Sequence, residues 1–259
     1  MKEKIYTIPV TEAFGQDCEC PVCLLEEKLE NEYTAYYLGP ALMEPDCRIE
    51  TNKKGFCRRH LEMLYNRQEN RLGLGLETDT HLKEQLEKLK ELSRAADEAV
   101  KGSRAANPLI GALAGKFQSK GRENAGPAAR LLEMLARFEA SCTICDRLEY
   151  TMDRYMDVVM HLWLHEEDFR KLFESRKGFC MVHLRRLAEA SAKYLRPDES
   201  AIFISLLLQQ QVENLERIEK DLDWFTKKFD YRNNDAPWGN SRDALPRSIR
   251  KLKGYSDLK

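Results

Sequence analysis

Residues 53–64 read KKGFCRRHLEML, and residues 176–187 read RKGFCMVHLRRL. Both stretches contain Gly-Phe-Cys-x-x-His, and a Cys-x-x-Cys pair precedes each of them, CPVC at 20–23 and CTIC at 142–145. In both copies 33 or 34 residues separate the pair from the next motif cysteine. A long pattern that recurs at matched spacing indicates a duplicated module.

The residue types in these motifs are those of a metal site. Six of the eight cysteines and two of the five histidines fall in the two copies. In a reducing compartment, Cys-x-x-Cys pairs are more often metal ligands or redox pairs than disulfides. Three thiolates and one imidazole form the closed tetrahedral shell of a structural zinc ion. We therefore predict one site per copy, the first with Cys20, Cys23, Cys57 and His60, and the second with Cys142, Cys145, Cys180 and His183.

The motifs leave other interpretations open. Two zinc ions are the expected cofactors, but thiolate-rich shells with one histidine also hold iron or iron–sulfur clusters. The eight residues can also be buried without a metal, whereas a redox dithiol alone does not explain the matched Cys-x-x-His. Cys18 is either a spare ligand or a plain thiol. Cys47, which aligns with Phe169, is expected to fill an apolar core position.

The segment between the two motifs of each copy predicts an outgoing and a returning helix. Helix-forming sequence follows each cysteine pair, and in the first copy it ends at Gly39-Pro40. Eighteen to twenty helical residues span roughly 27–30 Å, and a shorter helix then leads back to the Gly-Phe-Cys motif. We expect an all-α fold of two pseudo-repeated, metal-clipped helical hairpins, each followed by a long helix and joined by a flexible linker. Each metal would join the start of the first helix of its copy to the start of the third.

The two long helices are predicted by apolar stripes over 78–100 and from Pro197 to Phe229. We expect these stripes to form core or an interface between the halves, with a partner-binding groove as the alternative. His81 is expected at the surface of a polar helix. The predicted domains are a first module at 5–100, a flexible basic linker at 101–127, a second module at 128–230, and a tail at 231–259 that packs on the helices through Tyr231 and Trp238.

The composition indicates a soluble protein without a strong overall electrostatic field. Of the 259 residues 42% are hydrophobic and 33% are charged, and 43 acidic residues balance 42 basic ones. This balance does not favour a nucleic-acid or an acidic-membrane partner, although the basic linker keeps nucleic-acid binding as a minor alternative. No apolar run has the length of a signal peptide or of a membrane span. We expect a cytoplasmic protein.

The paired cysteine and histidine motifs, together with KKFDYRN, PWG and RSIRKLKG near the end, are distinctive in combination. From about residue 5 to about residue 254 the chain resembles a bacterial family of unknown function. The resemblance implies two cysteine/histidine sites on an all-helical body, carried by the eight residues named above, and it supplies no reaction.

The function predicted from the sequence is binding rather than catalysis. Four protein ligands close each predicted site, whereas a catalytic zinc keeps one position for water. The sequence has no Gly-rich phosphate loop, nucleophile elbow or His-Glu-x-x-His motif. We expect a zinc-stabilised protein, non-catalytic in this interpretation, that binds an unknown protein partner. A thiol-based or iron–sulfur-based redox or metal sensor is the alternative.

Overall fold

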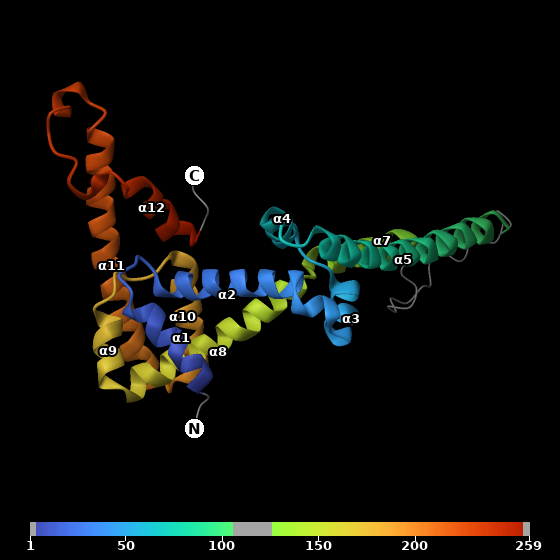
Figure 1. Ribbon diagram of the computed structural model, residues 1–259, viewed down its shortest axis with the longest axis horizontal. Coiled ribbons are helices and arrows are strands. Elements are labelled where there is room, and N and C mark those ends of the chain that lie inside the picture. Colours follow the sequence, from blue (N-terminus) through green and yellow to red (C-terminus); the bar gives the residue numbers. More distant parts are fainter. Residues whose placement is uncertain (1–3, 106–125, 256–259) are drawn as a thin grey trace, which may run out of the picture. The chain divides into compact units, whose positions relative to one another are not determined.

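The protein is all-α, as the sequence predicts. The computed structural model describes residues 4–105 and 126–255, and the regular elements in those ranges are all helical. Within the same ranges, no helix combines the length and the apolar character needed to cross a membrane. The α-helices are α1 (Lys4–Gly15), α2 (Pro21–Leu38), α3 (Pro45–Lys54), α4 (Arg58–Arg67), α5 (Arg71–Ala105), α7 (Pro127–Ala140), α8 (Thr143–His165), α9 (Glu167–Glu174), α10 (Met181–Tyr194), α11 (Pro197–Lys227) and α12 (Ala244–Lys253), with short 3-10 turns at Pro40–Met43, Tyr231–Asn233 and Gly239–Ser241 (Figure 1).

The chain divides into two compact units, and each unit combines parts of both sequence copies. Unit 1 comprises Met1–Asn31 and Leu148–Lys259, and unit 2 comprises Glu32–Arg147. Helix α2 begins in unit 1 and ends in unit 2, whereas α8 begins in unit 2 and ends in unit 1. The division therefore differs from the consecutive modules expected at 5–100 and 128–230, because each unit takes one half of each copy.

Phenylalanine side chains form the centre of unit 1, where α1, α9 and α11 meet (Figure 1). Phe14 of α1 lies 5.1 Å from Phe169 and 5.7 Å from Phe173, measured between ring centroids, and both partners belong to α9. Phe173 also lies 5.2 Å from Phe179 of the second Gly-Phe-Cys motif and 5.5 Å from Phe203 of α11. The motif phenylalanine thus anchors the second Gly-Phe-Cys loop to the core, and burying such a ring stabilises a fold by about 3–5 kcal/mol.

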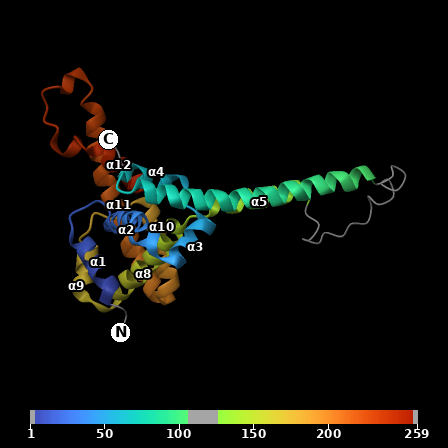
Figure 2. The same cartoon turned by 45° about the vertical axis from the view of Figure 1, so that its right-hand side comes forward.

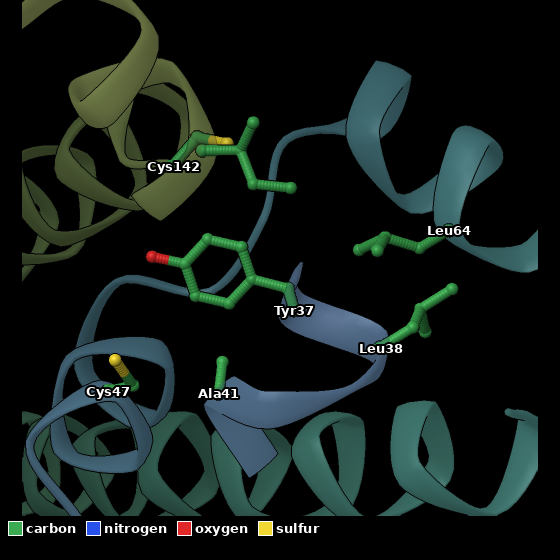
Figure 3. Packing of buried hydrophobic residues seen from close by; sticks show 7 residues of the cluster. Tyr37, Leu38, Ala41, Cys47, Leu64 and Cys142 are labelled. Carbon is green, nitrogen blue, oxygen red and sulfur yellow. The ribbon is translucent and has the colours of Figure 1, made fainter. Parts of the chain in front are cut away.

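The core of unit 2 surrounds Tyr37, which is fully buried. Figure 3 shows its ring among Leu38, Ala41, Leu64 and Cys142. Cys47, the cysteine predicted to fill a core position, belongs to this cluster and is only 4% exposed. Phe56 of the first Gly-Phe-Cys motif packs against Tyr37 with ring centroids 5.4 Å apart. The first motif is therefore anchored through its phenylalanine, like the second.

Helix α5, one continuous helix in Figure 2, does not bury the apolar stripe that predicted it. Leu82, Leu86 and Leu89 are 64%, 47% and 43% exposed. The helix instead packs through its first turns, where Glu77 is buried. His81 is half-buried against Gly55 rather than on an open surface, and its Nδ1 lies 2.7 Å from the carbonyl oxygen of Asn52. These three leucines therefore do not lie in the core, although α5 does contact α7 of the second predicted module.

Helix α11 begins at Pro197, as predicted, and buries only part of the predicted stripe. Ile218 of that stripe is 4% exposed. Leu208 and Val212 of the predicted stripe are more than half exposed, and Leu207 and Gln211 are buried instead. Three consecutive leucines at 206–208 allow two helical registers, so periodicity alone does not choose between them. The buried residues of α11 include Gln210 and Gln211, a residue type that is usually exposed and therefore looks like surface in a sequence.

The tail packs on α11 through polar and aromatic contacts that include Trp238, whereas Tyr231, the other predicted anchor, is 81% exposed. The indole Nε1 of Trp224 donates to the carbonyl of Pro237 at 3.0 Å, and the ring of Trp238 lies 6.1 Å from that of Phe225. Lys228 donates to the carbonyls of Asn234 and Ala236. Helix α12 then contacts α10 and α11.

The predicted linker at 101–127 is only partly described. Its first residues continue α5 as far as Ala105, and Pro127 begins α7. Residues 106–125 lie outside the described part of the chain.

Candidate metal centres

The eight predicted ligands form two groups of four, but with exchanged partners. Each group contains the Cys-x-x-Cys pair of one copy and the Cys-x-x-His pair of the other. The expectation that each copy closes its own site is therefore wrong. Site A, in unit 1, comprises Cys20, Cys23, Cys180 and His183, and site B, in unit 2, comprises Cys57, His60, Cys142 and Cys145.

Site A places three sulfurs around one imidazole nitrogen. The Nδ1 atom of His183 lies 3.2 Å from the sulfur of Cys180, 3.3 Å from that of Cys23 and 3.6 Å from that of Cys20. The sulfurs of Cys23 and Cys180 are 3.6 Å apart. The other ring nitrogen, Nε2, lies 3.3 Å from a carboxylate oxygen of Glu26. A histidine that binds a metal through one nitrogen commonly donates to a carboxylate through the other, which fixes the ring orientation.

Site B has the same arrangement. The Nδ1 atom of His60 lies 3.2 Å from the sulfurs of Cys57 and Cys142 and 3.4 Å from that of Cys145. The sulfurs of Cys57 and Cys145 are 3.7 Å apart.

These separations match four ligands around one ion. A tetrahedron with Zn–S bonds of about 2.3 Å and a Zn–N bond of about 2.0 Å has S···S edges of about 3.8 Å and S···N edges of about 3.5 Å. In each group all four ligand atoms lie within 4.8 Å of one another. Both groups therefore have the donor types, the donor number and the spacing for a single tetrahedral metal ion.

Local backbone geometry explains why the Cys-x-x-His motif presents its ligands together. Gly55 and Gly178 turn the chain with φ of 66° and 74°, values that disfavour a side chain. Cys57 and Cys180 then occupy the N-cap positions of α4 and α10. The Cys180 sulfur accepts a hydrogen bond from the backbone N–H of His183 at 3.4 Å. Ligands three positions apart at a helix start therefore face one point.

Backbone contacts in unit 2 explain the exchange of partners. The N–H of Thr143 donates to the carbonyl of Gly55 at 3.0 Å, and the hydroxyl of Ser141 donates to the carbonyl of Lys54 at 2.8 Å. These bonds join the second cysteine pair directly to the first Gly-Phe-Cys motif.

In unit 1 the corresponding connection is made by Lys251 of α12, which is only 1% exposed. Its ammonium group donates to the carbonyl of Glu19 at 2.8 Å and also to the carbonyl of Lys177. Gln211 of α11 adds two bonds to the same loop, accepting from the N–H of Phe179 at 3.0 Å and donating to its carbonyl at 2.9 Å. Gln211 lies outside the sequence motifs, and Lys251 lies in the RSIRKLKG segment, whose pattern indicates no role for a buried amine.

The electrostatics favour one thiolate in each group, Cys180 in site A and Cys142 in site B, and raise the pKa of Cys23 and Cys145. In site A, hydrogen bonds from the thiols of Cys20 and Cys23 hold the pKa of Cys180 well below its usual range. Burial acts to lower the pKa of His183, but hydrogen bonds to Cys180, Cys20 and Glu26 outweigh it and raise that pKa to about 11. These shifts favour a Cys180 thiolate beside a protonated His183, and a metal ion held by these residues would take the place of that proton.

In site B burial acts to raise the pKa of Cys142. Hydrogen bonds from His60 and from the backbone at Cys57 and Cys145 outweigh it and lower that pKa to about 6. A thiolate at Cys142 is therefore favoured at neutral pH, whereas burial raises the pKa of Cys145 in the same group.

The two sites differ in exposure. In site A, Cys20, Cys180 and His183 are buried, with Cys23 half-buried. In site B, Cys145 is exposed and Cys57 is half-buried. Cys18, considered as a spare ligand, is half-buried and belongs to neither group. Reagents in solution therefore have more direct access to site B.

A family model described as "Family of unknown function (DUF6062)" matches residues 1–259, the whole chain. The chain belongs to this family. The resemblance inferred from the paired motifs and the tail is thereby confirmed at the level of an uncharacterised family. No curated protein and no solved structure matches the chain. For this DUF6062 member, functional inference therefore starts from the two cysteine/histidine groups.

Proposed function

We propose that sites A and B each bind one zinc ion, and that this DUF6062 protein is a non-catalytic, zinc-stabilised helical protein that acts by binding a protein partner. The observation that carries the proposal is the spacing of the ligand atoms, all within 4.8 Å of one another in each group. Four protein ligands leave no position for a reacting water. A cluster with several irons distributes its protein ligands over different metal atoms, which spaces them more widely.

The binding role is supported by exposed apolar side chains on the long helices of unit 2. Leu82 and Leu86 of α5 are 64% and 47% exposed, and Leu132 and Phe138 of α7 are 67% and 49% exposed. Exposed apolar groups concentrated on neighbouring helices are typical of interaction surfaces. We also keep the expectation of a cytoplasmic location, which fits a chain whose eight cysteines are all free thiols.

One observation favours the alternative of a redox or metal sensor. The sulfurs of Cys57 and Cys145 lie 3.7 Å apart, and Cys145 is exposed. Oxidation of these two cysteines by a peroxide would form one S–S bond, reduce the peroxide to water or alcohol, and remove two of the four ligands of site B.

Metal analysis tests both candidates. The chain is purified without oxygen, its metal content is measured by mass spectrometry, and its absorption spectrum is recorded. About two zinc ions per colourless chain support the proposed function. Iron with visible absorption would favour the sensor, and a folded, fully reduced chain without metal would refute both.

A further inference from the structure

A cavity of about 440 Å³ lies in unit 2 between α3, α5 and α7, apart from the sulfurs of site B. Its volume is that of a small-molecule site. Five cationic side chains line it, and Glu133 is the one acidic group among the lining residues. The cationic residues are Lys53, Lys54, Lys88, Arg130 and Arg137.

Three of these cations are held in position by acidic partners. Lys54 lies 2.6 Å from Asp146, Arg137 lies 2.6 Å from Glu133, and Lys88 pairs with Glu84 on its own helix. In the described part of the chain, Lys53 and Arg130 form no ion pair, so their charges are available to a ligand.

The cavity also has an apolar wall, formed by Met134 and Phe138 of α7. The ring of Phe138 stacks on His81 with centroids 5.9 Å apart and an interplanar angle of 16°. Phe138 nevertheless keeps 49% of its surface exposed. An exposed aromatic surface beside uncompensated cations suits a ligand that has both a flat ring and an anionic group.

We propose that this cavity binds a small phosphate ester that carries an aromatic ring, which is the chemistry of a nucleotide. Arg130 and Lys53 contact the phosphate, because a guanidinium fork and an ammonium group are the side chains that bind phosphate best. Phe138 stacks on the ring of the ligand. This site is independent of the proposed metal-binding function, since none of its lining residues is a ligand of site A or site B.

Isothermal titration calorimetry with three probes tests the proposal: adenosine monophosphate, adenosine and inorganic phosphate. The full chain with its bound metal binds adenosine monophosphate more tightly than either fragment. The double variant Lys53→Glu/Arg130→Glu weakens this binding by about 10-fold or more. Phe138→Ala reduces the preference for adenosine monophosphate over inorganic phosphate.

A matched control is Lys83→Glu/Lys90→Glu, which changes the net charge equally on exposed positions of α5 outside the cavity lining. Circular dichroism and metal content verify that each variant is folded. The proposal is overturned by an absence of binding at ~10 mM adenosine monophosphate, by equal affinity for adenosine monophosphate and inorganic phosphate, or by equal weakening in the control.

Discussion

Lys251→Met tests whether a buried amine holds site A together. The ammonium group of Lys251 donates to the carbonyls of Glu19 and Lys177, which lie one position before Cys20 and three before Cys180. Removing the amine leaves these acceptors without that donor. Hydrogen bonds to a charged group contribute about 1.5–3 kcal/mol each.

Burial acts against the charged amine, because it is the main cause that lowers the pKa of Lys251. This desolvation cost offsets part of the stabilisation that the two hydrogen bonds contribute. We therefore expect the Lys251→Met variant to lose about 2–4 kcal/mol in the free energy of unfolding. Because the two bonds join the two halves of site A, we also expect zinc affinity at that site to fall about 10- to 100-fold.

The assay uses a Cys142→Ala background, in which site A is the remaining complete ligand set. Zinc affinity is measured by competition with a coloured chelator, and stability by urea unfolding. Lys253→Met is the matched control, since Lys253 is exposed at the same end of α12. Equal zinc affinity in Lys251→Met and the control would refute the proposed role of Lys251.

Three further predictions follow from burial and hydrogen bonding. Cys145 of site B is alkylated before Cys20 and Cys180 of site A, because Cys145 is exposed whereas Cys20 and Cys180 are buried; mass spectrometry of peptides after brief alkylation checks the order, and equal rates contradict it. Gln211→Leu destabilises the fold by about 2–4 kcal/mol, because it leaves the N–H and the carbonyl of Phe179 without their partner; urea unfolding should show a much smaller effect for the exposed Gln209→Leu. Burial raises the pKa of Glu77 despite its contact with Arg48. The folded state therefore binds the carboxyl proton of Glu77 more tightly than the unfolded state does. The stability that this protonation contributes is lost as pH rises through the raised pKa. In the Glu77→Gln variant, the free energy of unfolding should depend less on pH between the usual glutamate pKa and neutral pH. An unchanged pH dependence would contradict this reasoning.

The all-α fold and the eight clustered residues could be predicted because both depend on local patterns. Cys-x-x-Cys and Cys-x-x-His place ligands on one side of a turn or helix start, whichever partner completes the site. The partner itself depends on where the intervening helices lead the chain, which motif spacing does not report.

The helix lengths help to explain why the two copies exchange their ligand pairs. Helix α2 has 18 residues and α3 has 10, so the outgoing helix rises about 27 Å and the returning one about 15 Å. In the second copy α8 has 23 residues and α9 has 8, which gives about 34 Å out and about 12 Å back. Neither returning helix is long enough to bring Cys57 or Cys180 back to its own cysteine pair.

The polar residues that hold site A could not be predicted from the sequence. Gln211 and Lys251 satisfy backbone groups of loops far away in the chain. Their burial depends on the tertiary structure and is opposite to the usual behaviour of these residue types. The same limitation applies to the part of the α11 stripe that is exposed, Leu208 and Val212, because the buried Gln211 looks like a surface residue in a sequence.

Zinc content in two double variants tests the exchange of ligand pairs most directly. Cys20→Ala/Cys180→Ala removes two ligands from site A alone, whereas Cys20→Ala/Cys57→Ala removes one ligand from each site. After brief treatment with a chelator, the first variant should retain about one zinc ion per chain and the second about none. The reverse result, with zinc retained in Cys20→Ala/Cys57→Ala and lost in Cys20→Ala/Cys180→Ala, would show that each copy closes its own site and would contradict the account.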